Sequence, residues 1–381
     1  MRSAEHTLKL PTDADAASSS SVVVRRARYL MGTVWMIEAV AADKLVAQRA
    51  IGQAFDEVAR IERWASRFLP TSDVAWINAA AGGESVACEP ELVALLERCR
   101  MYTQLTDGAF DVTVGGALVD DPACGIRDAG HGESALLLHR GLTPQGSDPI
   151  GKVAIKRRSG QGICYHDGVW RRRCLTPSVG WAGEVECDRR RWVPGTTVGS
   201  RFLEVDVARC HVRLAKPGMA IDLGGVAKGY AVDRAVAVLR DGGVAGGSVN
   251  AGGNLRVFGS GVARTVAIRD PRVPSRALRW LTLSEVAVAT SGNYERTVQG
   301  MDGHLVDPAT GTAAAAGVLS VTVVADAAET ADAYSTALFV MGVRRGVAWA
   351  QRQRIRAVMV AAQPLLWYRH RIAVTEIGTR N

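Results

Sequence analysis

The stretch that most constrains this chain is a short apolar segment that ends in an acid and precedes two glycines and a helix. Residues 216–230 have the sequence KPGMAIDLGGVAKGY. Apolar residues at 232, 235, 236 and 239 form one helical stripe, so the helix is expected to continue to residue 240, before Gly242-Gly243. A strand–glycine–helix turn collects backbone N–H groups at the positive end of the helix dipole. This pattern predicts an anion site, usually for a phosphate.

Four residues of this turn are candidates for contact with such a ligand. Gly224 and Gly225 would let the backbone approach it closely, and Lys228 would add a mobile positive charge. Asp222 would bind a ribose hydroxyl, a metal or a base edge. The alternative is an ordinary strand-to-helix turn. The stretch matches neither G-x-G-x-x-G nor G-x-x-x-x-G-K-S/T, so neither a dinucleotide-binding fold nor a P-loop is indicated.

Length and hydropathy bound the class of protein. The chain has 381 residues and is 48% hydrophobic, which suits one large domain or two. No apolar run is long enough to cross a bilayer, so no transmembrane segment is expected. Residues 1–28 are expected to form a disordered leader without the pattern of a signal peptide. The expected location is therefore the cytoplasm, with the periplasm as the alternative if the N-terminus is incomplete.

The cysteines indicate free thiols. There are seven of them and no C-x-x-C pair. An odd number excludes a complete disulfide framework, and the spacing gives no support to a zinc site. A reducing compartment is the simplest interpretation.

Residues 119–212 are rich in Gly, Pro, Arg and Trp and have little periodicity, which predicts an irregular insertion at the surface. The formal net charge is +8, and residues 121–213 alone hold 15 Lys and Arg against 10 Asp and Glu. Arginines with interleaved tryptophans would suit a nucleic-acid patch, which is the alternative. Because the positive charge is concentrated in this segment, no uniformly basic face and no nucleic-acid partner are expected.

The remaining periodicity predicts a mixture of strands and helices. The expected strands lie at 29–40, 248–259 with a glycine break, 265–268, 287–290, 319–324 and within 355–375, and the expected helices at 43–64, 90–106 and from 329 onward.

Three other polar segments are candidates for chemistry. Ala109, Phe110 and Asp111 precede a double glycine; they would line a ligand cleft, or Asp111 would cap a tight turn. His304 lies three residues before Asp307 and would be a general acid or base, or a structural histidine.

The third candidate segment begins the last long helix. Asp332 and Thr336 share a helical face, and Ser335 is adjacent. A carboxylate with hydroxyls suits Mg²⁺. The alternative is a polar first turn on a core helix.

Seven segments taken together resemble one known family. They are Met31-Gly32-Thr33, Ser66-Arg67-Phe68, and residues 110–115, 222–229, 290–294, 304–311 and 331–338. In this order they are similar to the ApbE family of FAD:protein FMN transferases, over residues 29–118 and 214–375. The resemblance implies an α+β fold of mixed sheets and packed helices across 29–375, with FAD in a central cleft beside Mg²⁺.

The resemblance also implies an activity and a set of site residues. The enzyme would cut the FAD pyrophosphate, place FMN on a Thr or Ser hydroxyl of an acceptor protein and release AMP. His304 would be the base that activates the hydroxyl, and Asp222 would be both catalytic and an FAD contact. Mg²⁺ would be held by Gly225, through its backbone oxygen, with Asp332, Ser335 and Thr336. The FAD contacts would be Met31, Phe68, Ala109, Phe110, Asp111, Asp222, Lys228 and Val306.

Two departures from the family pattern stand out. The gap between Asp111 and Asp222 is longer than expected, and no lipoprotein cysteine lies near the start although many members are exported. The chain has no acceptor motif of the D-G-x-S/T-G-A-T kind, so the acceptor is expected to be a separate protein. Two alternatives remain: an FAD pyrophosphatase that uses water, and a non-catalytic flavin-binding protein, against which Asp332, Thr336 and His304 argue.

Overall fold

The computed structural model describes most of the chain between residues 21 and 377. The described residues are 21–120, 197–273, 275–292, 305–314, 317–363 and 371–377, with the strands at 154–156, 161–166, 169–174 and 190–192. The fold is of the α+β class with mixed helices and sheets, which confirms the fold class predicted from the sequence.

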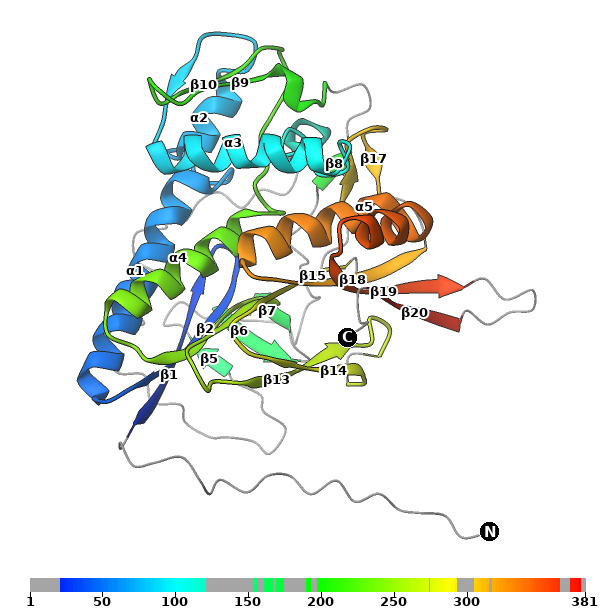
Figure 1. Cartoon of the computed structure of the whole chain (residues 1–381). Helices are drawn as coiled ribbons and strands as arrows, with labels where there is room; N and C mark the ends of the chain where they lie inside the picture. The colour runs from blue at the N-terminus through cyan, green and yellow to red at the C-terminus, as the bar shows by residue number, and fades with distance from the viewer. Residues whose placement is uncertain are drawn as a thin grey trace, which may run out of the picture.

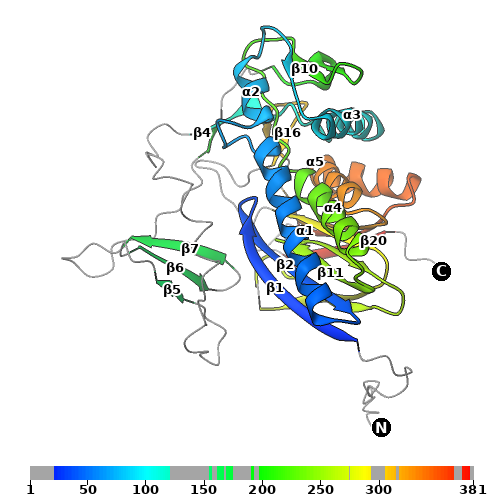
Figure 2. The same ribbon diagram turned by 90° about the vertical axis from the view of Figure 1, so that its left-hand side faces the viewer.

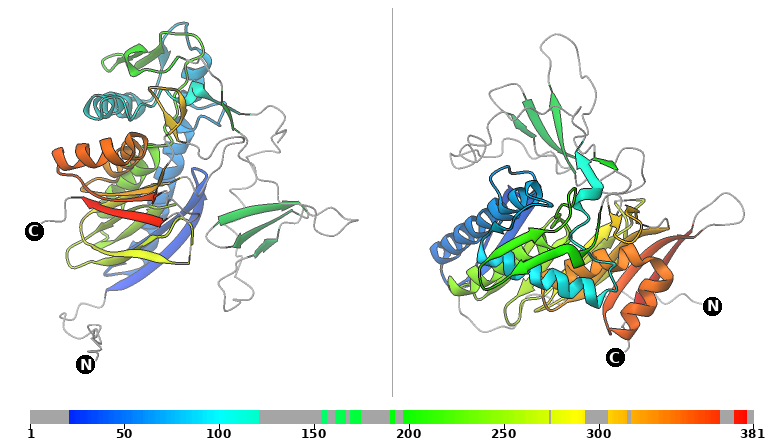
Figure 3. Two further views of the ribbon diagram at one scale, coloured as in Figure 1. Left: turned by 90° about the vertical axis from the view of Figure 1, so that its right-hand side faces the viewer. Right: turned by 90° about the horizontal axis from the view of Figure 1, so that it is seen from above.

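One antiparallel sheet of eight strands lies beneath the helix layer (Figure 1). Its order is β1-β2-β11-β12-β15-β18-β19-β20, so β1 and β20 are the edge strands (Figure 3). Every neighbouring pair is antiparallel. The strands are β1 (Val22–Leu30), β2 (Thr33–Ala41), β11 (Gly246–Ala251), β12 (Asn254–Phe258), β15 (Ala287–Gly292), β18 (Val318–Ala325), β19 (Arg356–Gln363) and β20 (Arg371–Ile377).

Three helices cover one face of this sheet: α1 (Lys44–Ala65), α4 (Ala227–Asp241) and α5 (Ala328–Arg352) (Figure 1). Helix α1 begins at Asp43, whose carboxylate accepts hydrogen bonds from the first-turn N–H groups of Leu45 and Val46. Helix α4 packs against both α1 and α5. The helices expected at 43–64 and from 329 onward are therefore confirmed.

The opposite face carries a two-stranded hairpin of β13 (Arg264–Arg269) and β14 (Ala277–Leu283). Strand β12 separates the two sides by the alternation of its side chains. Leu255 and Val257 lie in the small apolar cluster under the hairpin. Asn254, Arg256 and Phe258 point the other way, toward the helices. The polar side chains of Asn254 and Arg256 therefore reach the helix layer.

A smaller lobe lies beyond the helix layer (Figure 2). It contains α2 (Asp73–Ala79), α3 (Pro90–Leu105) and a three-stranded sheet in the order β3-β10-β9. Those strands are β3 (Val86–Ala87), β9 (Leu203–Asp206) and β10 (His211–Leu214). The expected helix at 90–106 is thus confirmed as α3.

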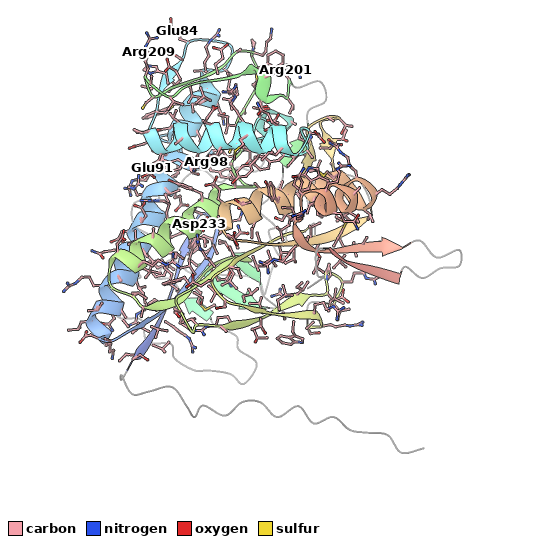
Figure 4. All side chains as sticks on the ribbon, in the orientation of Figure 1. Glu84, Glu91, Arg98, Arg201, Arg209 and Asp233 are labelled. Atoms are coloured by element: carbon pink, nitrogen blue, oxygen red, sulfur yellow. The ribbon has the colours of Figure 1, made fainter. Side chains whose placement is uncertain are left out.

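Ion pairs join this lobe to the helix layer. Figure 4 labels Glu91 and Arg98 on the side of α3 that faces α4 and α5. Arg98 donates from Nε and Nη2 to the buried Glu329 carboxylate at 2.8 and 3.0 Å, and Tyr102 donates to the same group at 3.2 Å. Glu91 accepts from the Tyr230 hydroxyl at 2.8 Å. These contacts fix α3 over the start of α5.

The strand expected at 29–40 is wrong in one respect, because the chain reverses within it. Met31 and Gly32 have φ angles of 48° and 72° and form a two-residue hairpin turn between β1 and β2. The disordered leader expected to reach residue 28 is also too long. Residues 22–28 pair with β2, and Val24 is buried in the core. Residues 1–20 lie outside the described residues.

The insertion expected at 119–212 ends too late and is not wholly irregular. Leu203, Val212 and Leu214 are buried in the main core, so β9 and β10 belong to the lobe. Upstream, the backbone forms a three-stranded antiparallel sheet and a two-stranded pair. The first contains β5 (Ala154–Lys156), β6 (Gln161–His166) and β7 (Val169–Cys174), and the second β4 (Leu118–Asp120) and β8 (Arg190–Trp192). Sparse periodicity concealed these short strands.

None of the helices in the described part of the chain is long and apolar enough to cross a membrane.

Replacing Arg98 tests the link between the lobe and the helix layer. Arg98→Ala leaves the Glu329 carboxylate buried without its cation, so we expect the free energy of unfolding to fall by about 2 kcal/mol. Arg100→Ala on the same helix removes only an exposed pair with Glu97 and should cost about 0.5 kcal/mol or less. Urea unfolding measures the free energy of unfolding of both variants. Equal losses in the two would contradict the role of the Arg98–Glu329 pair in linking the lobe to the helix layer.

Candidate functional site

The segment before the glycine turn is held by the Asn78 side chain and by the backbone of Val112. Asn78 of α2 brackets Ile221: its Oδ1 accepts from the Ile221 N–H at 2.6 Å, and its Nδ2 donates to the Ile221 carbonyl at 3.0 Å. The Asp222 N–H donates to the Val112 carbonyl at 2.8 Å. The buried strand expected here is reduced to a single bridge between Val114 and Ala220. The residues just before Asp222 therefore form an extended segment that is not part of a sheet.

Asp222 organises the turn that follows it. One carboxylate oxygen accepts from the Gly224 N–H at 2.7 Å, and the other pairs with Arg67 Nη1 at 3.0 Å. The Arg67 and Asp222 side chains are only 12% and 14% exposed. The Arg67 guanidinium also lies 5.3 Å from the ring centroid of Phe68, which is 57% exposed. Arg67 therefore contacts both Phe68 and Asp222, which are two of the predicted FAD contacts.

Helix α4 begins with the predicted lysine in its first turn. Lys228 Nζ donates to the Gly224 carbonyl at 2.6 Å, so its charge lies over the glycine turn. The helix start places the positive end of its dipole at the same point. These features would suit an anion, and binding of an anion at this turn stays a prediction.

Asp332 of α5 meets this helix start from the other side. Its side chain is buried, and its Oδ2 accepts two hydrogen bonds of 3.0 Å, from the Gly229 N–H and from Asn254 Nδ2. Burial raises the pKa of the Asp332 carboxyl above its ordinary value. The Lys228 charge and the two hydrogen bonds offset only part of this rise. Since both bonds end on Oδ2, Oδ1 is the oxygen available to a cation.

The crossing of α4 and α5 depends on Gly229. A Cβ at this residue would lie 2.3 Å from the Ala328 carbonyl oxygen and 2.8 Å from the Asp332 Cβ. Asp233, one turn further along α4 (Figure 4), accepts from the N–H groups of Ala328 and Glu329 at 2.9 Å and so caps α5. Arg256 of β12 pairs with the same carboxylate. The register of α5 against α4 is thereby fixed.

Hydroxyl groups surround the next turn of α5. Thr336 Oγ1 would lie 3.0 Å from a Cβ on Gly225, so α5 also contacts the glycine turn. The Ser291 Oγ of β15 lies 2.8 Å from Ser335 Oγ and 3.3 Å from Thr336 Oγ1. Ser335 is fully buried and donates to the Asp332 carbonyl at 3.0 Å. Thr336 is therefore better placed than Ser335 to contact a ligand directly.

These groups fit Mg²⁺. The donors are a carboxylate, hydroxyls and the backbone carbonyl near Gly225, all hard oxygens, and Mg²⁺ commonly takes one or two carboxylates and keeps several waters. Within the described residues, no group of three or more His, Cys, Asp or Glu side chains could hold a metal. A zinc site of the usual kind has no support there.

The segment of Ala109, Phe110 and Asp111 lies beside this centre. The Phe110 ring lies 3.5 Å from the position of a Cβ on Gly225. Asp111 accepts from the N–H and hydroxyl of Thr113 and from the N–H of Ser200. These three bonds support the tight-turn interpretation of Asp111. Contact of Asp111 with FAD stays a prediction.

The predicted site residues Met31 and Val306 lie in two separate hairpins. Met31 lies in the β1–β2 turn, where its N–H donates to Glu62 at 2.9 Å. Val306 begins the short hairpin of β16 (Val306–Asp307) and β17 (Thr312–Ala313) and packs with Ala117. His304 lies outside the described residues. A hollow at the surface is lined by Asp73, Ala87, Cys88, Glu89 and Pro90, none of which is a predicted site residue.

Sequence reasoning gave no role to four residues that the structure brings to the site: Arg67, Asn78, Asn254 and Ser291. Asn254 had a signal. The glycine break expected inside a strand at 248–259 is the turn of a β11–β12 hairpin at Gly252-Gly253, and Asn254 is the first residue after it. A double glycine between two strand-like runs is typical of such a turn.

Comparison with known proteins identifies the family. The sequence model of the ApbE family matches residues 31–131 and 177–359. The chain therefore belongs to the ApbE family, and the glycine turn with the start of α5 lies inside the matched region.

Curated relatives cover most of the chain. It is 27% identical over 348 residues to an FAD:protein FMN transferase of Klebsiella pneumoniae, covering 90% of each protein. It is 28% identical over 342 residues to one of Treponema pallidum, covering 85% of this chain and 80% of the relative. The crystal structure of the ApbE protein of Thermotoga maritima superposes with a TM-score of 0.62 at 26% identity, covering 89% of this chain and 94% of that one.

A methyl group at Gly229 should disrupt the helix crossing. Gly229→Ala places a Cβ inside the contact distance of the Ala328 carbonyl, so we expect the free energy of unfolding to fall by about 2 kcal/mol. Gly52→Ala in α1, where nothing lies within 4 Å of the new Cβ, should instead raise it by about 0.5 kcal/mol. Thermal melting of both variants measures this, and a stable Gly229→Ala protein would refute the close crossing.

Proposed function

We propose that this protein transfers FMN from FAD to a Thr or Ser hydroxyl on a separate acceptor protein, in a Mg²⁺-dependent reaction that releases AMP. The observation that carries the proposal is the meeting of the Asp332 carboxylate with the Lys228 end of α4. A cation and an anion would bind side by side there, as a metal-bound pyrophosphate requires. Curated relatives that match most of the chain are named FAD:protein FMN transferase.

The residues present divide into a metal side and a phosphate side. Asp332 and Thr336, with the backbone oxygen near Gly225, would hold Mg²⁺, and Ser291, which bonds to both Ser335 and Thr336, would support Thr336. Bound Mg²⁺ would polarise the phosphate oxygens and ease the departure of AMP.

The phosphate side is built from α4 and the segment before it. Lys228 and the helix start would stabilise negative charge on the pyrophosphate oxygens as it develops. The Lys228 ammonium would release the Gly224 carbonyl and bind the phosphate in its place. This exchange is feasible because the hydrogen bond between Lys228 and Gly224 is exposed. Asp222, held by Arg67 and by the Gly224 N–H, would orient the ligand as a fixed acceptor.

The remaining groups would bind the flavin and the acceptor. Met31, Phe68, Ala109, Phe110, Asp111 and Val306 are the proposed FAD contacts, and the Phe68 side chain, which is 57% exposed, would pack against the ligand. His304 is proposed as the base that takes the proton of the acceptor hydroxyl.

The test is covalent transfer to an acceptor domain. Purified protein, FAD, Mg²⁺ and a domain carrying a D-G-x-S/T-G-A-T motif should yield the acceptor with the added mass of FMN, and EDTA should prevent it. AMP and free FMN without labelling would identify a pyrophosphatase. Tight FAD binding without AMP release would identify a carrier. Either of these outcomes contradicts the transferase proposal.

Replacing Asp332 tests the metal assignment. Asp332→Ala removes the one carboxylate proposed as a ligand, so we expect Mg²⁺-dependent transfer to fall by at least about 100-fold. Asp270→Asn alters another buried aspartate, near the β13–β14 hairpin, and should leave the rate within about twofold. Unchanged AMP release by Asp332→Ala would exclude this metal site.

A further inference from the structure

We infer that Asn254 is a positioning residue that orients the Asp332 carboxylate for Mg²⁺. The inference rests on the proposed function, and it assigns a role to a residue on the sheet, outside α5 and the glycine turn that carry the proposed ligands. Asn254 Nδ2 donates to Asp332 Oδ2 at 3.0 Å, and the Gly229 N–H donates to the same oxygen at 3.0 Å. Two donors on one oxygen leave the other oxygen for the cation.

The direction of the hydrogen bond is fixed by chemistry. A carboxylate only accepts, so the amide must present its NH₂ group to Asp332. Asn254 is 2% exposed and Asp332 is 4% exposed, so no bulk water replaces this donor. A buried carboxylate that loses a donor keeps its cost of desolvation and gains rotational freedom. The Asn254 amide therefore acts through Asp332 and is not itself a ligand.

The position of Asn254 is set by the backbone around it. It begins β12 immediately after the Gly252-Gly253 turn and pairs with Ala251. Two residues later, Arg256 points to the same side and pairs with Asp233, which caps the start of α5. One strand thus holds both the N-terminus of α5 and the carboxylate in its second turn. Partners of metal ligands in such positions are commonly worth 10- to 100-fold in metal affinity.

The experiment measures Mg²⁺ affinity apart from turnover. Melting temperatures are followed against increasing MgCl₂ at constant ionic strength for the wild-type protein and for Asn254→Leu, Asn254→Ala, Thr322→Val and Asp332→Ala. Thr322 is a buried residue of β18 whose hydroxyl bonds to Thr290, so Thr322→Val matches the loss of one buried hydrogen bond without touching Asp332.

We expect both Asn254 variants to need roughly 10- to 100-fold more Mg²⁺ for the same stabilisation, while Thr322→Val keeps the wild-type value. In the transfer assay, the Mg²⁺ concentration for half-maximal rate should rise by the same factor. Saturating Mg²⁺ should then restore the maximal rate and the KM for FAD to within a few-fold. A structural defect alone would lower the melting temperature equally at every Mg²⁺ concentration.

The opposite results are distinguishable. Wild-type Mg²⁺ affinity in both Asn254 variants, with affinity lost in Asp332→Ala, would overturn the role of Asn254 and leave the proposed function standing. Unchanged Mg²⁺ affinity in Asp332→Ala would overturn the metal assignment and this inference with it. Asn254→Ala keeps the measurement decisive if the larger leucine prevents folding.

Discussion

The hydrogen bond from the Gly229 N–H to the Asp332 carboxylate is the contact on which the site depends. It forms only because α4 and α5 cross so closely that a Cβ at Gly229 would meet the Ala328 carbonyl at 2.3 Å. The crossing places a buried acid beside the positive start of a helix, with Lys228 at the same end. In the proposed function, the Asp332 carboxylate would bind the cation, and Lys228 with the start of α4 would bind the phosphate.

The rest of the fold maintains this crossing. Asp233 caps α5 and is itself paired with Arg256 of the sheet, so helices and sheet share one polar junction. The lobe adds a second junction through Arg98 and Glu329 at the start of α5. Such buried charges contribute little to stability beyond what apolar packing would give, but they fix one register of the helices. We propose that register, more than stability, is what the site requires of them.

Sequence patterns predicted the long helices and the glycine turn before α4 well, because both depend on local periodicity and on glycine. The long helix before residue 65 and the helix after Gly225 follow directly from their apolar stripes. Chain reversals were harder: Met31-Gly32 and Gly252-Gly253 are turns of paired strands, and a strand pattern continues through both. Asn254 and Arg67 were missed because their partners lie 78 and 155 residues away, and no local pattern encodes such contacts.

A crystal soaked with FAD and Mn²⁺ in place of Mg²⁺ tests the account most directly, since anomalous scattering locates the metal. The account predicts one anomalous peak within metal–oxygen distance, about 2.2 Å, of Asp332 Oδ1, with Thr336 Oγ1 and the backbone oxygen near Gly225 as neighbours and a phosphate oxygen completing the shell. Lys228 should then contact the same pyrophosphate. The account would be contradicted if the crystal still released AMP while the metal was bound elsewhere and did not contact Asp332.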